Sequence, residues 1–116
     1  MSDAPDAPRA SFGSFFADLP GPGGPEAFDP VAALPGARIE RITSHGHETP
    51  PGEWYDQAWD EWVLVLTGGA ILQCEGEAPR AMSPGDWAHL PAHVRHRVEA
   101  TAEGQPTVWL AVHAGE

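Results

Sequence analysis

The chain has 116 residues, of which 41% are hydrophobic and 20% are charged. This length suits a single domain, and the composition excludes a fully disordered chain because it supplies enough apolar side chains for a core. Acidic residues dominate: 17 Asp and Glu stand against 6 Arg, with no Lys, for a formal net charge of -11. Nucleic-acid binding depends on cations that neutralise phosphates, so we expect no DNA or RNA partner.

The sequence also carries no sign of a membrane protein. No apolar run approaches the roughly 18 residues needed to span a bilayer, and the first residues lack the basic start and apolar stretch of a secretion signal. We therefore expect a cytoplasmic protein that does not enter a membrane.

The first third of the chain differs in composition from the rest. Residues 1–36 are rich in Pro and Gly, which interrupt long helices and central strands. We expect a disordered tail over residues 1–11 and, over residues 12–36, a segment that wraps around the main body and includes a short helical turn between Glu26 and Leu34. Four apolar side chains of this segment are expected to dock on that body: Phe12, Phe15, Phe16 and Leu19.

Residues 37–115 show the pattern of an all-β fold. Short apolar stretches are broken by turn residues at intervals of about ten residues. The expected strands cover residues 38–44, 61–67, 70–75, 79–82, 86–90, 95–101 and 107–113. Short strands in this number, with no helix between them, predict a closed or nearly closed antiparallel barrel, because closure removes exposed strand edges.

One segment of this region carries Gly, Pro and His at a characteristic spacing. Gly85 is followed six residues later by Pro91, and His96 comes five residues after Pro91. This spacing resembles the second motif of the cupin superfamily. His93 stands where the family usually has a second Gly, and Ala100 stands where it often has Asn.

An upstream segment resembles half of the first cupin motif, which places a His-x-His pair before a Glu and then a Gly. Glu61 and Gly68 have the spacing of that Glu and Gly. Other residues take the positions of the two histidines. The motif allows either three or four residues before the Glu: three place Tyr55 and Gln57 at the histidine positions, and four place Trp54 and Asp56 there.

The resemblance covers residues from about 12 to 115 and is closest to small single-domain bacterial cupins. It implies a cupin-type barrel, also described as a double-stranded β-helix or jelly roll, that holds one divalent metal ion (Fe, Mn, Ni or Zn). Glu61 and His96 carry over as metal ligands. Gln57 and Tyr55 join them in the predicted set, since they share the parity of Glu61 and so face the same side of a strand.

Alternatives to this ligand set stay open. Asp56 is chemically a better ligand than Gln57, although its parity points it the other way. His47 belongs to a separate His-x-His pair at residues 45–47, which either lies in a surface loop or folds over the barrel mouth and reaches the metal. Without a metal, Glu61 and His96 would be a hydrogen-bonded pair that lines a pocket for an organic ligand.

Other side chains near these motifs suggest roles in ligand binding and proton transfer. Trp54 and Trp62 are expected to wall a pocket for a planar or apolar molecule, or to cover a barrel end or dimer interface. His93 is either a ligand contact at the barrel mouth or a turn residue. Tyr55 and His93 are the candidates for moving protons. We expect the remaining charged neighbours to face solvent (Arg95, Arg97) or to pack or lie on the surface (His89, His113).

These features predict a small metal-binding cupin whose pocket acts on or binds a small organic molecule. If it is an enzyme, the metal would support oxygenase, isomerase or lyase chemistry. The alternative is a metal-free module that binds or senses a small molecule in the same pocket. Strand 61–67 is apolar on both faces, and this feature and the resemblance to small cupins together predict a homodimer.

Overall fold

The computed structural model describes residues 7–116, which form eight strands. In chain order the strands are β1 (Ala27–Leu34), β2 (Ala37–Ser44), β3 (Asp60–Thr67), β4 (Ala70–Cys74), β5 (Arg80–Met82), β6 (Trp87–Leu90), β7 (His96–Thr101) and β8 (Thr107–Ala114). The seven strands expected from the sequence correspond to β2 to β8, each within one residue at either end. None of the described residues forms a helix capable of crossing a lipid bilayer.

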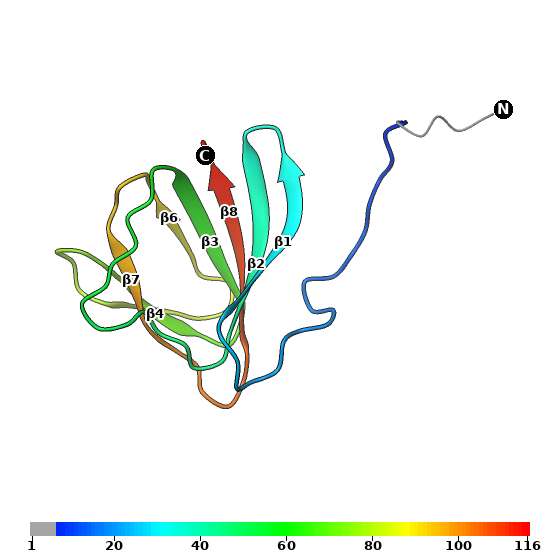
Figure 1. The fold of residues 1–116 in the computed structure, drawn as a ribbon. Helices are drawn as coiled ribbons and strands as arrows, with labels where there is room; N and C mark the ends of the chain where they lie inside the picture. Colours follow the sequence, from blue (N-terminus) through cyan, green and yellow to red (C-terminus); the bar gives the residue numbers. More distant parts are fainter. Residues whose placement is uncertain (1–6) are drawn as a thin grey trace.

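The strands build two antiparallel sheets that enclose the interior of a barrel (Figure 1). The larger sheet has the order β1-β2-β8-β3-β6, and the smaller sheet has the order β5-β4-β7. Apart from the consecutive pairs β1–β2 and β4–β5, neighbouring strands are distant in sequence, as expected when a jelly roll wraps its strands around a common core. The all-β jelly-roll barrel predicted from the sequence is confirmed.

Strand β1 occupies the region for which a short helical turn was expected, so that expectation is wrong. Its backbone pairs with β2 along the whole strand, from Ala27 opposite Thr43 to Leu34 opposite Ala37. Pairing with an available strand edge overrides the local preference of this Pro-rich segment. Pro30 is tolerated because β1 lies at the edge of the sheet, and the register shifts beside it.

The segment before β1 leaves the barrel rather than packing tightly on it (Figure 1). The expected docking of Phe12 and Phe16 is wrong, since their side chains are 94% and 52% exposed. Polar contacts hold the segment instead: Arg41 Nη1 donates to the carbonyl oxygens of Phe15 and Ala17 at 3.2 and 2.6 Å. Residues 1–6 of the predicted disordered tail lie outside the described residues.

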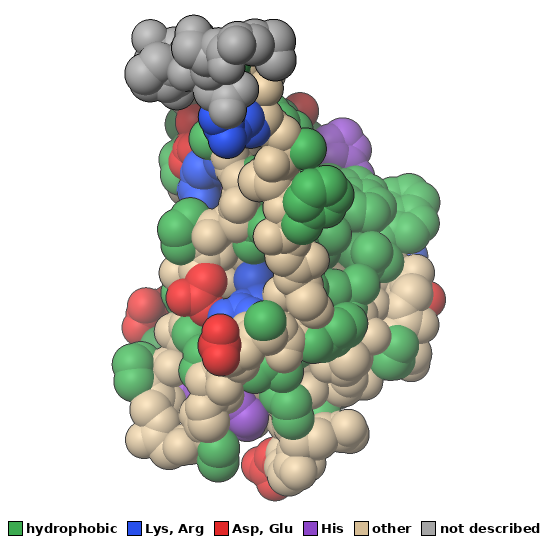
Figure 2. All heavy atoms as spheres, turned by 90° about the vertical axis from the view of Figure 1, so that its right-hand side faces the viewer, with side chains coloured by type: hydrophobic (Ala, Val, Ile, Leu, Met, Phe, Trp, Pro, Cys, Tyr) green, Lys and Arg blue, Asp and Glu red, His purple; other side chains and the backbone are tan. Residues whose placement is uncertain are grey.

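Apolar side chains gather on the face that carries β1 and this segment (Figure 2). The exposed members of this group include Phe28, Val31 and Leu34 of β1. An exposed apolar surface of this kind is typical of a contact with another chain. It suits the homodimer, which stays a prediction.

The inward face of the barrel changes character along its strands. At one end it is a compact apolar core made by Val63, Val65, Ala70, Leu72, Met82, Leu90, Trp109 and Ala111. Toward the other end, the inward positions of β2, β3 and β8 become polar, with Arg38, Glu61 and His113 on neighbouring strands. The core therefore seals one end of the barrel and leaves polar groups to line a cavity at the other.

Candidate functional site

A cavity of about 300 Å³ lies inside the barrel, between the two sheets. This volume is at the lower end of the range found for small-molecule sites. Its apolar lining comes from Phe28, Ile42, Val63, Leu72, Leu90, Val98 and Trp109. Its polar and aromatic lining comes from Glu26, Arg38, Glu40, Tyr55, Gln57, Trp59, Glu61, His96 and His113.

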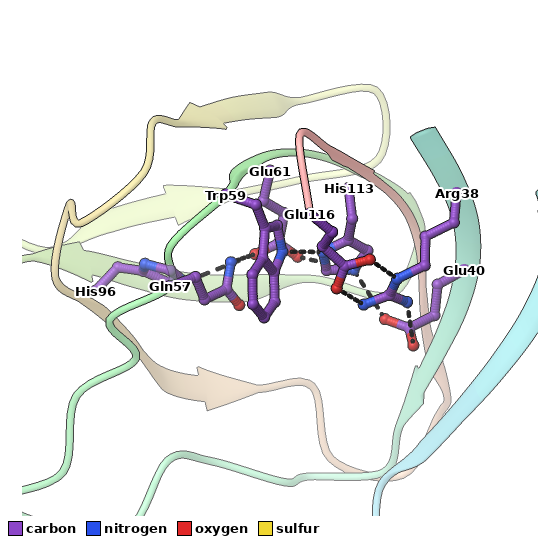
Figure 3. Close-up of polar contacts among 8 residues, drawn as sticks. All are labelled: Arg38, Glu40, Gln57, Trp59, Glu61, His96, His113 and Glu116. Carbon is purple, nitrogen blue, oxygen red and sulfur yellow. Dashed lines mark hydrogen bonds and ion pairs between the residues drawn. The ribbon is translucent and has the colours of Figure 1, made fainter. Parts of the chain in front are cut away.

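Glu61 stands at the centre of the polar lining (Figure 3). It is the second residue of β3, lies opposite His113 of β8, and is only 6% exposed. Its Oε1 accepts a hydrogen bond from Gln57 Nε2 at 3.1 Å. Two imidazole nitrogens approach it: His96 Nε2 lies 3.8 Å from Oε1, and His113 Nε2 lies 3.8 Å from Oε2. The structure therefore brings together three of the predicted ligands, Gln57, Glu61 and His96.

The fourth, Tyr55, is fixed to His96 by the backbone. Tyr55 N donates to His96 O at 2.7 Å, and His96 N donates to Tyr55 O at 3.1 Å, which forms an isolated bridge between the loop and β7. The two rings stack with centroids 5.5 Å apart. Burial and then the charges of Glu26, Glu61 and Glu53 raise the pKa of Tyr55, so its phenol stays neutral.

The hydrogen bonds of His96 fix which ring nitrogen faces the cavity. Its Nδ1 lies 3.0 Å from the carbonyl oxygen of Val94. A carbonyl only accepts, so Nδ1 carries the proton and donates it. In the neutral ring, the Nε2 lone pair is then directed toward Glu61 and is available to accept a proton or to bind a cation.

Sequence reasoning missed His113, which it placed in the packing or on the surface. His113 is buried and lines the cavity directly opposite Glu61. Trp59 Nε1 donates to its Nδ1 at 2.9 Å, so in the neutral ring Nε2 carries the proton and faces Glu40 Oε1 at 3.1 Å. His113 and Trp109 lie an even number of positions apart on one strand, so they face the same side of the sheet. This shared face with an apolar residue was the sequence feature that could have identified His113.

Two predicted ligand-binding tryptophans do not line the cavity. Trp62 alternates with Glu61 and so lies on the outer face of the sheet, where it stacks on Trp87 with ring centroids 6.1 Å apart. Trp54 lies beneath two guanidinium groups, those of Arg95 and Arg97, at 5.8 and 5.9 Å. These contacts place both indoles outside the barrel interior.

The predicted residues His93, Asp56 and His47 also lie outside the cavity lining. His93 Nδ1 is 2.9 Å from Asp56 Oδ1 in an exposed pair that joins two loops. His47 Nδ1 accepts a hydrogen bond from the backbone of His45, so its Nε2 donates to the carbonyl oxygen of Gly24 at 2.8 Å. The His-x-His pair at residues 45–47 thus ties down the segment before β1.

His93 adopts a backbone conformation that suits Gly, with φ 67°. We expect His93→Gly to be more stable than His93→Ala by about 1 kcal/mol, because both lose the pair with Asp56 but only Gly avoids the cost of a left-handed conformation. Chemical denaturation measures the difference. The same pair of substitutions at Glu103, whose φ is not positive, should show the usual order with Ala more stable. If Ala is also the more stable residue at position 93, the backbone conformation is not the cause.

The expected metal centre can be tested against these donors. Of its four predicted ligands, Tyr55 is a neutral phenol and the Gln57 amide donates to Glu61, which leaves only Glu61 and His96 as strong ligands. Among residues 7–116, no three His, Cys, Asp or Glu side chains are arranged to hold a metal ion. Catalytic zinc sites, for comparison, use three protein ligands. The residues present do not fit the metal centre that the resemblance implies.

Comparisons with known proteins agree with the fold. The family model described as Cupin domain matches residues 41–113. Among solved structures, a Ralstonia eutropha JMP134 protein described as a "putative mannose-6-phosphate isomerase" is 53% identical, with a TM-score of 0.88 over 92% of this chain and 100% of that chain. No curated protein matches.

More distant structures share the fold alone. An RmlC-like cupin protein from Desulfovibrio desulfuricans is 16% identical, with a TM-score of 0.74 over 92% of this chain and 98% of that chain. A cupin superfamily protein from Desulfitobacterium hafniense DCB-2 is also 16% identical, with a TM-score of 0.68 over 84% of each chain. Given the jelly-roll barrel, the matched family model and these relatives, the chain belongs to the cupin family.

Proposed function

We propose that the barrel cavity binds a small organic molecule without a metal ion, and that the Glu61 carboxylate accepts a hydrogen bond or a proton from it. The observation that carries this proposal is the buried Glu61 carboxylate in the cavity wall, with Gln57, His96 and His113 around it. An ionised carboxylate has about four acceptor sites, and Gln57 fills one of them. The others are available to a ligand.

The two histidines give Glu61 complementary neighbours. In the neutral form of each ring, the Nε2 of His96 is a proton acceptor and the Nε2 of His113 is a proton donor. A ligand beside Glu61 would meet the free acceptor of His96, while the Nε2 proton of His113 is held by Glu40 at 3.1 Å. This combination suits proton transfer next to a carbonyl or hydroxyl group, for which buried carboxylates and histidines are the usual acids and bases.

The charge of the cavity narrows the ligand class. Glu26, Glu40 and Glu61 line it, and Arg38 is the only Arg or Lys among the described lining residues. A mannose-6-phosphate isomerase must bind a phosphate dianion, which this balance disfavours. We therefore infer a proton-transfer substrate without a phosphate group, even though the relative from Ralstonia eutropha carries that description.

Two neutral probes test the role of Glu61. Lactamide carries a hydroxyl group that propionamide lacks, so we expect lactamide to bind more tightly and to shift the imidazole NMR signals of His96 and His113. Glu61→Gln should weaken lactamide binding about tenfold, the effect of losing a hydrogen bond to a charged group, and leave propionamide unchanged. His89→Gln, on the outer face, is the control and should change neither affinity.

Two results would contradict the role given to Glu61. If neither amide shifts the NMR signals of His96 and His113, the cavity does not bind these molecules and the proposal is wrong. If the parent protein and Glu61→Gln bind lactamide with equal affinity, the Glu61 carboxylate takes no part in binding.

Elemental analysis separates this proposal from a metal-dependent cupin, the second candidate. One observation favours that candidate: the Nδ1 of His96 donates to a backbone carbonyl, as the second nitrogen of a metal-binding His usually does. We expect protein purified without a histidine tag or chelator to contain far less than one metal ion per chain. Near one ion per chain, lost in Glu61→Gln and His96→Gln, would establish a metal centre and overturn the metal-free proposal.

A further inference from the structure

At the rim of the cavity, the Arg38 guanidinium is paired with the carboxylate of Glu116 (Figure 3). Arg38 Nε lies 2.5 Å from Glu116 Oε2, and Arg38 Nη2 lies 2.9 Å from Glu116 Oε1. Two nitrogens on one edge of the guanidinium thus meet two oxygens of one carboxylate. This two-point geometry is the one by which Arg recognises carboxylates in general.

The pair is held in place but remains open to solvent. Gly115 N donates to Gly36 O at 3.1 Å, which directs the following residue toward β2. The side chains of Arg38 and Glu116 are 38% and 36% exposed. Hydrogen bonding to Arg38 lowers the pKa of Glu116, so its carboxylate stays charged to a lower pH than that of an ordinary Glu. Exposed ion pairs contribute little stability, so another carboxylate can replace Glu116 at low cost.

Polar contacts connect Arg38 to the centre of the site. Arg38 Nη1 lies 3.4 Å from Glu40 Oε2, and Glu40 Oε1 lies 3.1 Å from His113 Nε2. His113 is the residue opposite both Arg38 on β2 and Glu61 on β3. Arg38 and Glu61 therefore flank His113 on neighbouring strands, and a small molecule held by Arg38 would extend toward Glu61.

We propose that Arg38 is the anchor for a carboxylate group of the ligand, and that this carboxylate takes the place of the Glu116 side chain. This inference rests on the proposed function and adds the class of ligand, a small organic monocarboxylate. Charge supports it: exchanging one carboxylate for another leaves the charge paired with Arg38 unchanged. A phosphate dianion would instead add negative charge beside Glu40.

Lactate and lactamide test the anchor, because they have the same shape and differ in the carboxylate. In the parent protein, lactate should bind more tightly than lactamide, as read from the imidazole signals of His96 and His113. Arg38→Gln should remove this preference, and Arg38→Lys should keep part of it, since Lys retains the charge but not the two-point geometry. Arg80→Gln removes a cation from the exposed strand β5 and is the control for net charge.

The Glu116→Gln variant tests the displacement. It should bind lactate about threefold to tenfold more tightly than the parent, because the tethered competitor is weakened, and should bind lactamide unchanged. Glu77→Gln, an exposed acid elsewhere, should leave both affinities unchanged. In the Arg38→Gln background, Glu116→Gln should have no effect on lactate.

The possible results separate this inference from the proposed function. Equal binding of lactate and lactamide, both at the cavity histidines, would overturn the anchor and leave the proposed function standing. A clear preference for lactate with no gain in Glu116→Gln would overturn the displacement. If neither lactamide nor propionamide shifted the signals of the cavity histidines, the proposed function would fall, and this inference with it.

Discussion

Arg97→Met is expected to lower the free energy of unfolding by about 3–5 kcal/mol, the usual cost of breaking a buried charged network. Arg97 is only 8% exposed, which corrects the expectation that it faces solvent. Its guanidinium donates to the carbonyl oxygens of Thr49, Pro50 and Glu53 at 3.0–3.2 Å, and to Glu99 Oε1 at 2.9 Å. Met fills similar space but leaves these acceptors without their donor.

The effect should reach the site, because the same loop carries Tyr55 and Gln57. Without Arg97, the amide of Tyr55, which donates to His96 O, should exchange faster with solvent in hydrogen-exchange measurements. Chemical denaturation gives the change in stability. The faster exchange should also extend to the amide of Glu53, whose carbonyl Arg97 binds.

Arg95→Met is a closely matched control. Arg95 lies on the other side of His96 and over the same indole, that of Trp54, but its side chain is 45% exposed and pairs with Glu75 at the surface. Its replacement should change stability by no more than about 0.5–1 kcal/mol. If the two substitutions cost the same, burial of Arg97 and its bonds to the loop do not hold the site together.

Gly68→Ala is the second substitution with a large expected effect, a loss of about 3–5 kcal/mol from steric overlap and backbone strain together. Gly68 has φ 79°, and an added Cβ would lie 2.4 Å from Thr107 Oγ1 and 2.7 Å from Pro106 O. Thr107 cannot give way easily, because its hydroxyl donates to Gly69 O at 3.0 Å and accepts from Gly69 N at 3.2 Å. The clash would separate the β3–β4 turn from β8.

Gly85→Ala distinguishes overlap from strain. Gly85 also has a positive φ, 94°, but an added Cβ would meet no atom within 4 Å. Its cost should therefore be that of the backbone conformation alone, about 1–2 kcal/mol. Thermal and chemical denaturation of both variants measure the difference. Equal losses at the two positions would mean that contact with Thr107 is not what requires Gly68.

The fold was largely predictable from the sequence because its determinants are local. The alternation of apolar residues and the Gly and Pro turns located β2 to β8, and the cupin-like spacing around Gly85, Pro91 and His96 indicated the family. Strand β1 was missed because its pairing with β2 depends on an edge that exists only in the folded sheet. A Pro-rich segment gives no local sign of that edge.

The candidate site was predictable only in part, for a similar reason. Gln57, Glu61 and His96 were found by motif spacing and parity, and the structure brings them together. The roles of His113 and Arg38 depend on register between strands that lie far apart in sequence, which places His113 beside Glu61 and Arg38 on the far side of His113. Trp62 and His93 looked suitable by position in the chain but face away from the cavity.

The sequence by itself thus determined which residues form strands β2 to β8 and which family the barrel belongs to, because strand period and turn chemistry act over a few neighbouring residues. Only the tertiary structure decided which charges meet. The pairing of Arg38 with Glu116 joins side chains 78 positions apart, and that of Trp59 with His113 joins side chains 54 apart. Contacts of this kind are set by sheet register and chain reversal, and they decide which groups face the cavity together.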